Sequence, residues 1–169
     1  MYMAFLQRSG GQLVLFALSL LGIAISIYLT TVHYQNVPLV CSTQGFVDCE
    51  RVLSSPFSVV PGTSLPITIP GLLWFMVSGS LAFVSWRFWP DQRNLRIAEL
   101  LWIVIGMLTV LYLVYVEIVR LHTLCAWCTA VHVIMLLMLL LALVQWQRPE
   151  EGQLEEQDEE PSSAPIMRK

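Results

Sequence analysis

The segment LCAWCTAVHVIMLLMLLLAL, residues 124–143, runs for twenty residues without a charged side chain. A helix rises 1.5 Å per residue, so roughly 20 apolar residues cross the roughly 30 Å hydrocarbon core of a bilayer. The segment therefore predicts a membrane-spanning helix. It also opens with a Cys-x-x-Cys pair, Cys125 and Cys128, so the end of a span carries two thiols.

Three other segments have the same apolar character. They cover residues 13–32, 67–86 and 97–116, and only the last contains a charge, Glu99, near an end from which we expect it to reach the headgroups. Helices are expected because backbone groups in lipid must be hydrogen-bonded internally. The chain is 56% hydrophobic and 12% charged, against about 25% charged in soluble domains. We predict an all-α integral membrane protein, a four-helix bundle in the lipid bilayer, with no nucleic-acid partner.

The arginines predict the orientation, because short cytoplasmic loops are enriched in Lys and Arg. Arg8 precedes the first span, and Arg148 follows the fourth. Arg87, Arg93 and Arg96 lie at or between the ends of the second and third spans. Arg51 and Arg120 lie in the other two loops. We therefore predict cytoplasmic termini, and extracytoplasmic loops at residues 33–66 and 117–123.

The chain divides into three predicted parts. Residues 1–12 form a cytoplasmic N-terminus, residues 13–146 form the membrane domain, and residues 147–169 form a cytoplasmic tail rich in acidic residues. The tail has too few apolar residues to fold alone, so we expect it to be disordered. The loop between the first two spans contains Pro and Gly, which rule out one long helix, but Asp48 to Leu53 fit a short one.

All four cysteines fall on the predicted outer side. Cys41 and Cys49 lie in the first outer loop, and Cys125 and Cys128 lie at the outer end of the fourth span. Proximity along the chain predicts the pairs Cys41–Cys49 and Cys125–Cys128, and disulfides persist in an oxidising compartment. Thr123 is the expected helix cap, and the positive helix end stabilises a thiolate. We predict a relay in which the loop pair passes electrons to the helix pair by thiol–disulfide exchange.

Three other interpretations of the cysteines remain open. Two static disulfides would staple the structure, but a Cys-x-x-Cys within one helix constrains little chain. A four-thiolate zinc site needs close spacing in both halves, whereas Cys41 and Cys49 are eight residues apart, so we expect no metal. The third interpretation is a membrane scaffold without enzymatic activity. Replacing a cysteine would then change the abundance of the protein but not electron transfer.

A relay needs an acceptor, and the sequence favours one dissolved in the membrane. The chain has no Gly-rich nucleotide motif and no apparent haem-ligand pair, so a quinone is the expected acceptor. His132 lies one helical turn deeper than Cys128, and we predict that it donates a hydrogen bond to the quinone. The alternative is a neutral histidine bonded to a neighbouring helix. We interpret His122 as an interfacial polar residue.

These motifs together resemble the vitamin K epoxide reductase family. The resemblance rests on the loop pair Cys41-x₇-Cys49, the run CERVLSSPF at 49–57, IPG at 69–71 and CAWC at 125–128, within roughly residues 12–145. It implies a four-helix bundle around a quinone, capped by the loop or short helix between the first two spans.

The resemblance also implies roles for single residues. Cys128 gives electrons to the quinone, Cys125 exchanges with Cys49, and Cys41 exchanges with an external thioredoxin-like protein. Ser55 supports the site. The residues that match quinone-pocket positions are Leu53, Ser55, Phe57, Trp74, Leu113 and His132.

The sequence departs from the animal enzymes at two quinone-contacting positions. These enzymes carry Tyr where His132 stands and Asn where Ile67 stands, which argues against epoxide reduction and favours a bacterial homologue. Some bacterial homologues have a thioredoxin domain fused at the C-terminus, whereas this sequence has the acidic tail there, so we expect the type without a fused thioredoxin domain. We therefore predict a thiol:quinone oxidoreductase of the bacterial inner membrane that supports disulfide bond formation with a separate DsbA-like partner. The quinone is menaquinone, ubiquinone or vitamin K. The alternative is reduction of vitamin K quinone or its epoxide as the desired product. A DsbB-like oxidase fits less well, because its pattern places the Cys-x-x-Cys near the end of the first helix pair.

Overall fold

The computed structural model describes residues 2–35, 40–41, 46–88 and 93–147. It confirms the all-helical class, with four helices long and apolar enough to cross a membrane. Within the described residues the only β pairings are two isolated bridges. The elements are α1 (Tyr2–Gln35), α2 (Cys49–Leu53), the 3₁₀ turn η1 (Pro56–Ser58), α3 (Thr68–Arg87), α4 (Arg93–Tyr115), the π-helix η2 (Val116–Leu121) and α5 (Ala126–Gln147).

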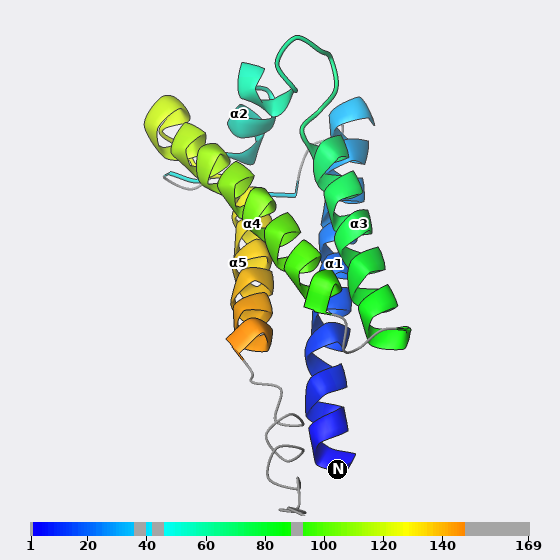
Figure 1. The fold of residues 1–169 in the computed structure, drawn as a ribbon. Coiled ribbons are helices and arrows are strands. Elements are labelled where there is room, and N and C mark those ends of the chain that lie inside the picture. Colours follow the sequence, from blue (N-terminus) through cyan, green and yellow to red (C-terminus); the bar gives the residue numbers. More distant parts are fainter. Residues whose placement is uncertain (1, 36–39, 42–45, 89–92, 148–169) are drawn as a thin grey trace, which may run out of the picture.

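The four long helices pack in a ring. α1 lies along α3, α3 against α4, α4 against α5 and α5 against α1. α4 crosses the others obliquely, and α1 begins at the same end of the bundle at which α5 ends (Figure 1). The short helix α2 lies at the opposite end. The fold therefore gathers the first loop and the start of α5 at one end.

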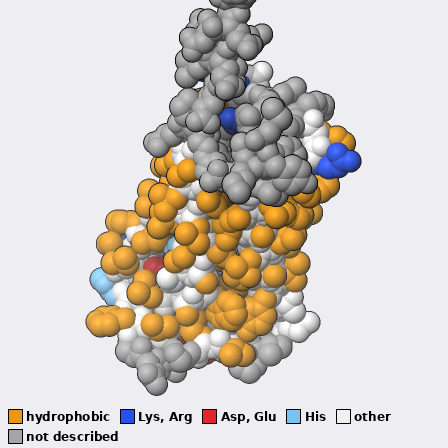
Figure 2. Space-filling model, turned by 90° about the horizontal axis from the view of Figure 1, so that it is seen from below, with side chains coloured by type: hydrophobic (Ala, Val, Ile, Leu, Met, Phe, Trp, Pro, Cys, Tyr) orange, Lys and Arg blue, Asp and Glu red, His pale blue; other side chains and the backbone are white. Residues whose placement is uncertain are grey.

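The bundle has apolar side chains both inside and outside, as expected of helices in lipid. Its interior contains Leu15, Phe75, Ile103 and Met138, none more than 2% exposed. Hydrophobic side chains also cover most of the described surface in Figure 2. A Cβ at Gly106 would overlap Trp74 and Met135, so this glycine lets the helices approach closely.

The third span is longer than its predicted range of 97–116. α4 begins at Arg93, and η2 continues the helical path to Leu121 with π-type turns. The chain then reverses at His122, which is exposed and has a φ of 53°. This left-handed residue ends the span just before the Cys-x-x-Cys.

The prediction that Glu99 reaches the headgroups is wrong. Its side chain is only 6% exposed, and Nε2 of Gln12 donates a 3.0 Å hydrogen bond to its Oε2. The same Gln12 nitrogen donates to Oε1 of Gln145 at 2.9 Å. Neighbouring helices thus bring two amides to this end of the bundle, and the carboxylate turns inward because a hydrogen bond offsets part of its desolvation.

Candidate redox site

The first loop is attached to the segment before α5 by main-chain hydrogen bonds. The N–H of Leu124 donates to the carbonyl of Phe46 at 2.8 Å, and the N–H of Asp48 donates to the carbonyl of Leu124 at 3.0 Å. Val47 and Leu124 thereby form a parallel bridge. Because Cys49 follows Asp48 and Cys125 follows Leu124, this pairing brings the two cysteines together.

The short helix α2 begins at this attachment. Asp48 is its N-cap, and its Oδ1 accepts the backbone N–H of Arg51 at 3.0 Å. The cap satisfies an otherwise unpaired amide at the helix start. The short helix predicted at Asp48 to Leu53 is thus confirmed, and it turns Cys49 inward, where the side chain is fully buried.

A second attachment holds the chain beside Cys41. Nε1 of Trp127 donates to the carbonyl of Val40 at 3.0 Å, and the Val40 N–H donates to the Tyr28 hydroxyl at 3.3 Å. The rings of Tyr28 and Trp127 lie 4.9 Å apart. We call Tyr28 and Trp127 the aromatic clamp, since α1 and α5 use them to hold one loop residue from both sides.

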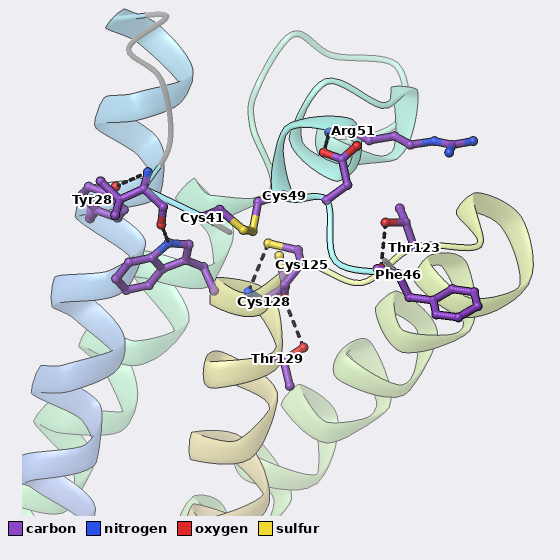
Figure 3. Close-up of a disulfide and its surroundings, with 12 residues drawn as sticks. Tyr28, Cys41, Phe46, Cys49, Arg51, Thr123, Cys125, Cys128 and Thr129 are labelled. Carbon is purple, nitrogen blue, oxygen red and sulfur yellow. Dashed lines mark hydrogen bonds between the residues drawn. A yellow bond between two sulfur atoms is a disulfide. The ribbon is translucent and has the colours of Figure 1, made fainter. Parts of the chain in front are cut away.

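The cysteines form one closed and one open pair. Cys41 and Cys49 are joined in a disulfide, as predicted from their proximity, while Cys125 and Cys128 are free thiols. The sulfur of Cys125 points toward the Cys41–Cys49 disulfide (Figure 3). Cys49 and Cys125 are both fully buried, so exchange between the two pairs takes place inside the protein.

Cys125, rather than Thr123, caps α5. The predicted Thr123 cap is wrong, because its Oγ1 donates to the carbonyl of Phe46 at 3.0 Å and α5 starts three residues later. Instead the backbone N–H of Cys128 donates to Sγ of Cys125 at 3.3 Å. The hydrogen bond from the Cys128 thiol lowers the pKa of Cys125, against the opposing effect of burial. Cys125 is therefore the sulfur best prepared to act as a thiolate nucleophile.

A small apolar cavity lies beneath the two thiols. Its volume is about 60 Å³, and its lining includes Cys128. Five of the six residues predicted to contact a quinone also line it: Leu53, Ser55, Phe57, Leu113 and His132. Ligand pockets usually measure about 300–1,000 Å³, so a ring would enter only if the lining side chains moved apart.

Trp74, the sixth predicted pocket residue, is not among the residues lining this cavity. Its ring stacks on that of Trp102 with centroids 6.2 Å apart and makes an edge contact with Phe75. A Cβ at Gly106 would overlap it. The structure therefore places Trp74 between α3 and α4 as a packing residue.

The cavity also contains a residue that the sequence motifs did not single out. Glu117, in η2, lines it together with Cys128 and His132 and is 4% exposed. An ionisable side chain within a membrane span points by default to function, and this signal was present in the sequence. No set of three or more His, Cys, Asp or Glu side chains in the described part of the chain is arranged to hold a metal.

One comparison with known proteins gives a match. The family model described as "Vitamin K epoxide reductase family" matches residues 13–143, which is more than half of the chain and includes all four cysteines. No curated protein matches the chain. The matched range includes the docked loop and most of the four long helices.

Proposed function

The chain belongs to the vitamin K epoxide reductase family, and from this premise we propose that it is a membrane thiol:quinone oxidoreductase. Membership makes it an integral membrane oxidoreductase of a family that uses quinones. The finer proposal is that electrons enter at Cys41–Cys49, pass to Cys125–Cys128 and reduce a quinone. Their source is a separate thioredoxin-like dithiol, and the outcome is regeneration of disulfide-forming capacity.

One observation carries the proposal. A disulfide and a dithiol from distant parts of the sequence face each other through their buried members, Cys49 and Cys125, and Cys128 lines an apolar cavity. Structural disulfides need no free thiol beside them. A chain of sulfurs that ends at a cavity supports electron transfer instead.

The steps follow thiol–disulfide exchange. A thiolate of the partner attacks the sulfur of Cys41 and releases Cys49 as a thiolate, and the second partner thiol then frees Cys41. Cys49 next attacks Cys125 in the closed helix pair and releases Cys128, after which Cys41 resolves the mixed disulfide. The helix pair is now reduced and the loop pair is oxidised, which is the state of the four cysteines in this structure.

Reduction of the quinone closes the cycle. Cys125 and Cys128 join in a disulfide and release two electrons and two protons, which together convert the quinone to the quinol. The residues that we propose to hold the ring are those of the cavity, with His132 as hydrogen-bond donor. Menaquinone, ubiquinone and vitamin K share the ring chemistry that this site requires.

The proposed orientation follows from the arginines. The cysteine end faces the extracytoplasmic side of a bacterial inner membrane, and both termini, including the acidic tail, face the cytoplasm. Labelling of intact cells with a membrane-impermeant maleimide after mild reduction tests it. Cys41, the more exposed cysteine of the loop pair, should react without permeabilisation, whereas labelling only after permeabilisation would reverse the orientation.

Quinone reduction by the purified protein in detergent tests the function. A reduced DsbA-like protein or a small dithiol supplies electrons, and absorbance follows the quinone. We expect Cys128→Ala to be inactive with either donor. Cys41→Ala should fail with the protein donor and keep partial activity with the small dithiol, because that dithiol can enter further along the relay.

The matched control is Ser85→Ala, which also replaces a small polar side chain by alanine, at a buried position in α3. It should turn over like the wild type. If the wild type never exceeds the protein-free rate while all variants remain folded, the enzyme proposal falls and a scaffold with structural disulfides replaces it. Conversion of an added quinone epoxide to quinone would instead favour the epoxide-reductase alternative.

A further inference from the structure

Glu117 is held in place by the irregular end of the third span. It is the second residue of the π-helix η2, and π-type turns inside helices occur frequently at functional sites. Its backbone carbonyl accepts the N–H groups of both His122 and Thr123, the latter at 3.1 Å. The main chain on both sides of Glu117 is therefore fixed, and with it the direction of the side chain.

Glu117 shares the cavity with Cys128 of the reduced cysteine pair. Glu117 and Cys128 both line it, and the carboxylate lies close enough to the Cys128 thiol to interact with it electrostatically. The carboxylate is therefore a nearby acceptor for the Cys128 proton. Among the described residues, no other carboxylate lines the cavity.

One oxygen of this carboxylate has no partner among the described residues. Oε2 of Glu117 is buried and makes no hydrogen bond to them, and an unpaired buried polar atom is costly. Because Glu117 lines the cavity, a group that enters it can supply the missing partner. Glu117 therefore combines a position near the Cys128 thiol with an unused acceptor.

We propose that Glu117 is the proton carrier between the Cys125–Cys128 dithiol and the quinone. This inference rests on the proposed function. The carboxylate takes the proton of the Cys128 thiol as the thiolate reacts, and it delivers that proton to a carbonyl oxygen of the quinone. The second proton leaves Cys125 as the disulfide closes and follows through the same carboxylate, which ends the cycle ionised as it began.

The balance of the reaction needs no further reactant. Two thiols lose two electrons and two protons and gain one S–S bond, while one quinone gains both electrons and both protons. The site excludes bulk water around the buried Cys125, so a proton carrier inside it has a defined task. His132 lines the same cavity and remains the proposed hydrogen-bond donor to the ring, whereas Glu117 is the carboxylate that shares the cavity with Cys128.

The substitution Glu117→Gln tests the proposal, because it keeps the size of the side chain and removes its ability to take a proton. With a small dithiol as donor, we expect kcat for quinone reduction to fall about 100-fold or more, the usual contribution of a positioned base. KM for the quinone should change little. Glu117→Asp, which keeps a carboxylate, should recover part of the rate.

The chain offers a matched control in Glu99→Gln. Glu99 lies on the same span, is equally buried at 6% exposure, and faces amides rather than thiols. Glu99→Gln should stay within about threefold of the wild type, a change of less than about 1 kcal/mol in the barrier. A comparable loss in both glutamine variants would mean that a buried glutamate is needed only for folding, and the proposal would be overturned.

A second readout does not depend on the quinone. In the reduced protein, the rate of Cys128 alkylation, read by mass spectrometry, should increase in Glu117→Gln, because a neutral amide no longer repels the thiolate. Faster alkylation combined with slower quinone reduction is the signature of a proton carrier. A variant that is merely distorted has no reason to move these two rates in opposite directions.

The outcomes separate this inference from the proposed function. If the wild type reduces quinone and Glu117→Gln does so equally well, the inference falls and the oxidoreductase remains. If the wild type does not reduce quinone at all, both fall. If Glu117→Gln alone fails and Glu117→Asp partly recovers, Glu117 is the proton carrier.

Discussion

The span from Arg93 to Leu121 buries one glutamate near each end, and the two carboxylates have different neighbours. Glu99 accepts a hydrogen bond from the amide of Gln12, and neither group reacts under ordinary conditions. Glu117 lines a cavity together with Cys128, and its Oε2 has no hydrogen-bond partner among the described residues. Burial alone therefore says little about function, and the chemistry of the neighbours distinguishes a structural carboxylate from a candidate catalytic one.

The same contrast holds for the two ends of the bundle. At one end, amides from α1 and α5 join Glu99 in a side-chain network that ties three helices together. At the other end, main-chain bonds and the aromatic clamp dock a loop that carries a disulfide. We expect perturbations at the cysteine end to change electron transfer and perturbations at the opposite end to change stability.

The largest expected effect concerns which loop cysteine meets Cys125. In the double variant Cys41→Ala with Cys128→Ala, only Cys49 and Cys125 remain. Both are fully buried and adjacent to the Asp48–Leu124 hydrogen bond, so a mild oxidant should join them rapidly. The measurement is the rate at which the linked peptides appear by mass spectrometry.

The control is the pair Cys41 and Cys125, left by Cys49→Ala with Cys128→Ala. We expect it to close on the order of 100-fold more slowly, since positioning two groups accelerates their reaction by large factors. Equal rates in the two variants would show that the loop presents either sulfur to Cys125. The proposed order of the relay would then be wrong.

The next effect is a change in pH dependence at Cys125. The Cys128 thiol lowers the pKa of Cys125 through a hydrogen bond to its sulfur, so the reduced wild type has more Cys125 thiolate below the ordinary thiol pKa. Cys128→Ala removes the donor, raises the pKa of Cys125 and should slow its alkylation at neutral pH. The rate follows the thiolate fraction, which falls about tenfold when the pKa rises by about one. Rates of Cys125 alkylation as a function of pH measure it.

Cys128→Ser is the matched variant for this experiment, because its hydroxyl can still donate to the Cys125 sulfur. Its alkylation profile should stay close to that of the wild type. If the alanine and serine variants change equally, the backbone N–H of Cys128 and the helix end, rather than the side chain, hold the Cys125 thiolate. Both substitutions remove the second thiol, so the comparison isolates the donor.

A smaller effect is expected at the aromatic clamp. Trp127→Phe removes the donor to the Val40 carbonyl but keeps a ring against Tyr28. Loss of one such hydrogen bond costs about 1 kcal/mol, so we expect exchange from the loop pair to Cys125 to slow about fivefold. Rapid mixing with the reduced partner protein followed by acid quenching, in a quench-flow experiment, measures this step.

Trp102→Phe provides the comparison for the clamp. Nε1 of Trp102 donates to Oγ of Ser78 at 3.2 Å in the middle of the bundle, away from the loop. This variant loses a hydrogen bond of the same kind and should lower thermal stability without slowing exchange. Equal slowing in both variants would indicate that the clamp acts only through overall stability.

Much of this architecture was predictable from hydropathy. Four apolar windows gave four helices, because apolar length is sufficient to identify a span. The helix ends were less predictable: η2 extends the third span to Leu121, and α5 starts at Ala126 rather than Leu124. Thr123 is a favourable cap by residue type, but the docked loop offers its hydroxyl a carbonyl, and a tertiary contact of this kind cannot be read from a local pattern.

The candidate site was predictable in part for similar reasons. The cysteines and five of the cavity residues came from motifs and from the family resemblance, whereas Trp74, the sixth predicted residue, stacks on Trp102 and is not in the cavity lining. Glu117 was not among the predicted site residues. Its place in the same cavity lining as Cys128 depends on the π-helix and the reversal at His122, because the two residues are eleven apart in the sequence.

The smallest effect on electron transfer is expected at Gln12, and it tests the contrast most directly. Gln12→Leu removes the amide that donates to Glu99 and to Gln145, so a buried carboxylate loses a partner. The thermal midpoint in detergent should fall, because an unpaired buried polar group costs about 1–3 kcal/mol. Quinone reduction measured well below that midpoint should stay within about twofold of the wild type, since Gln145 lies near the end of α5 and α5 ends on the side of the bundle opposite to α2. A large loss of turnover with an unchanged thermal midpoint would contradict this contrast. It would mean that the amide cluster around Glu99 influences the reaction directly and does not act by holding the helices together.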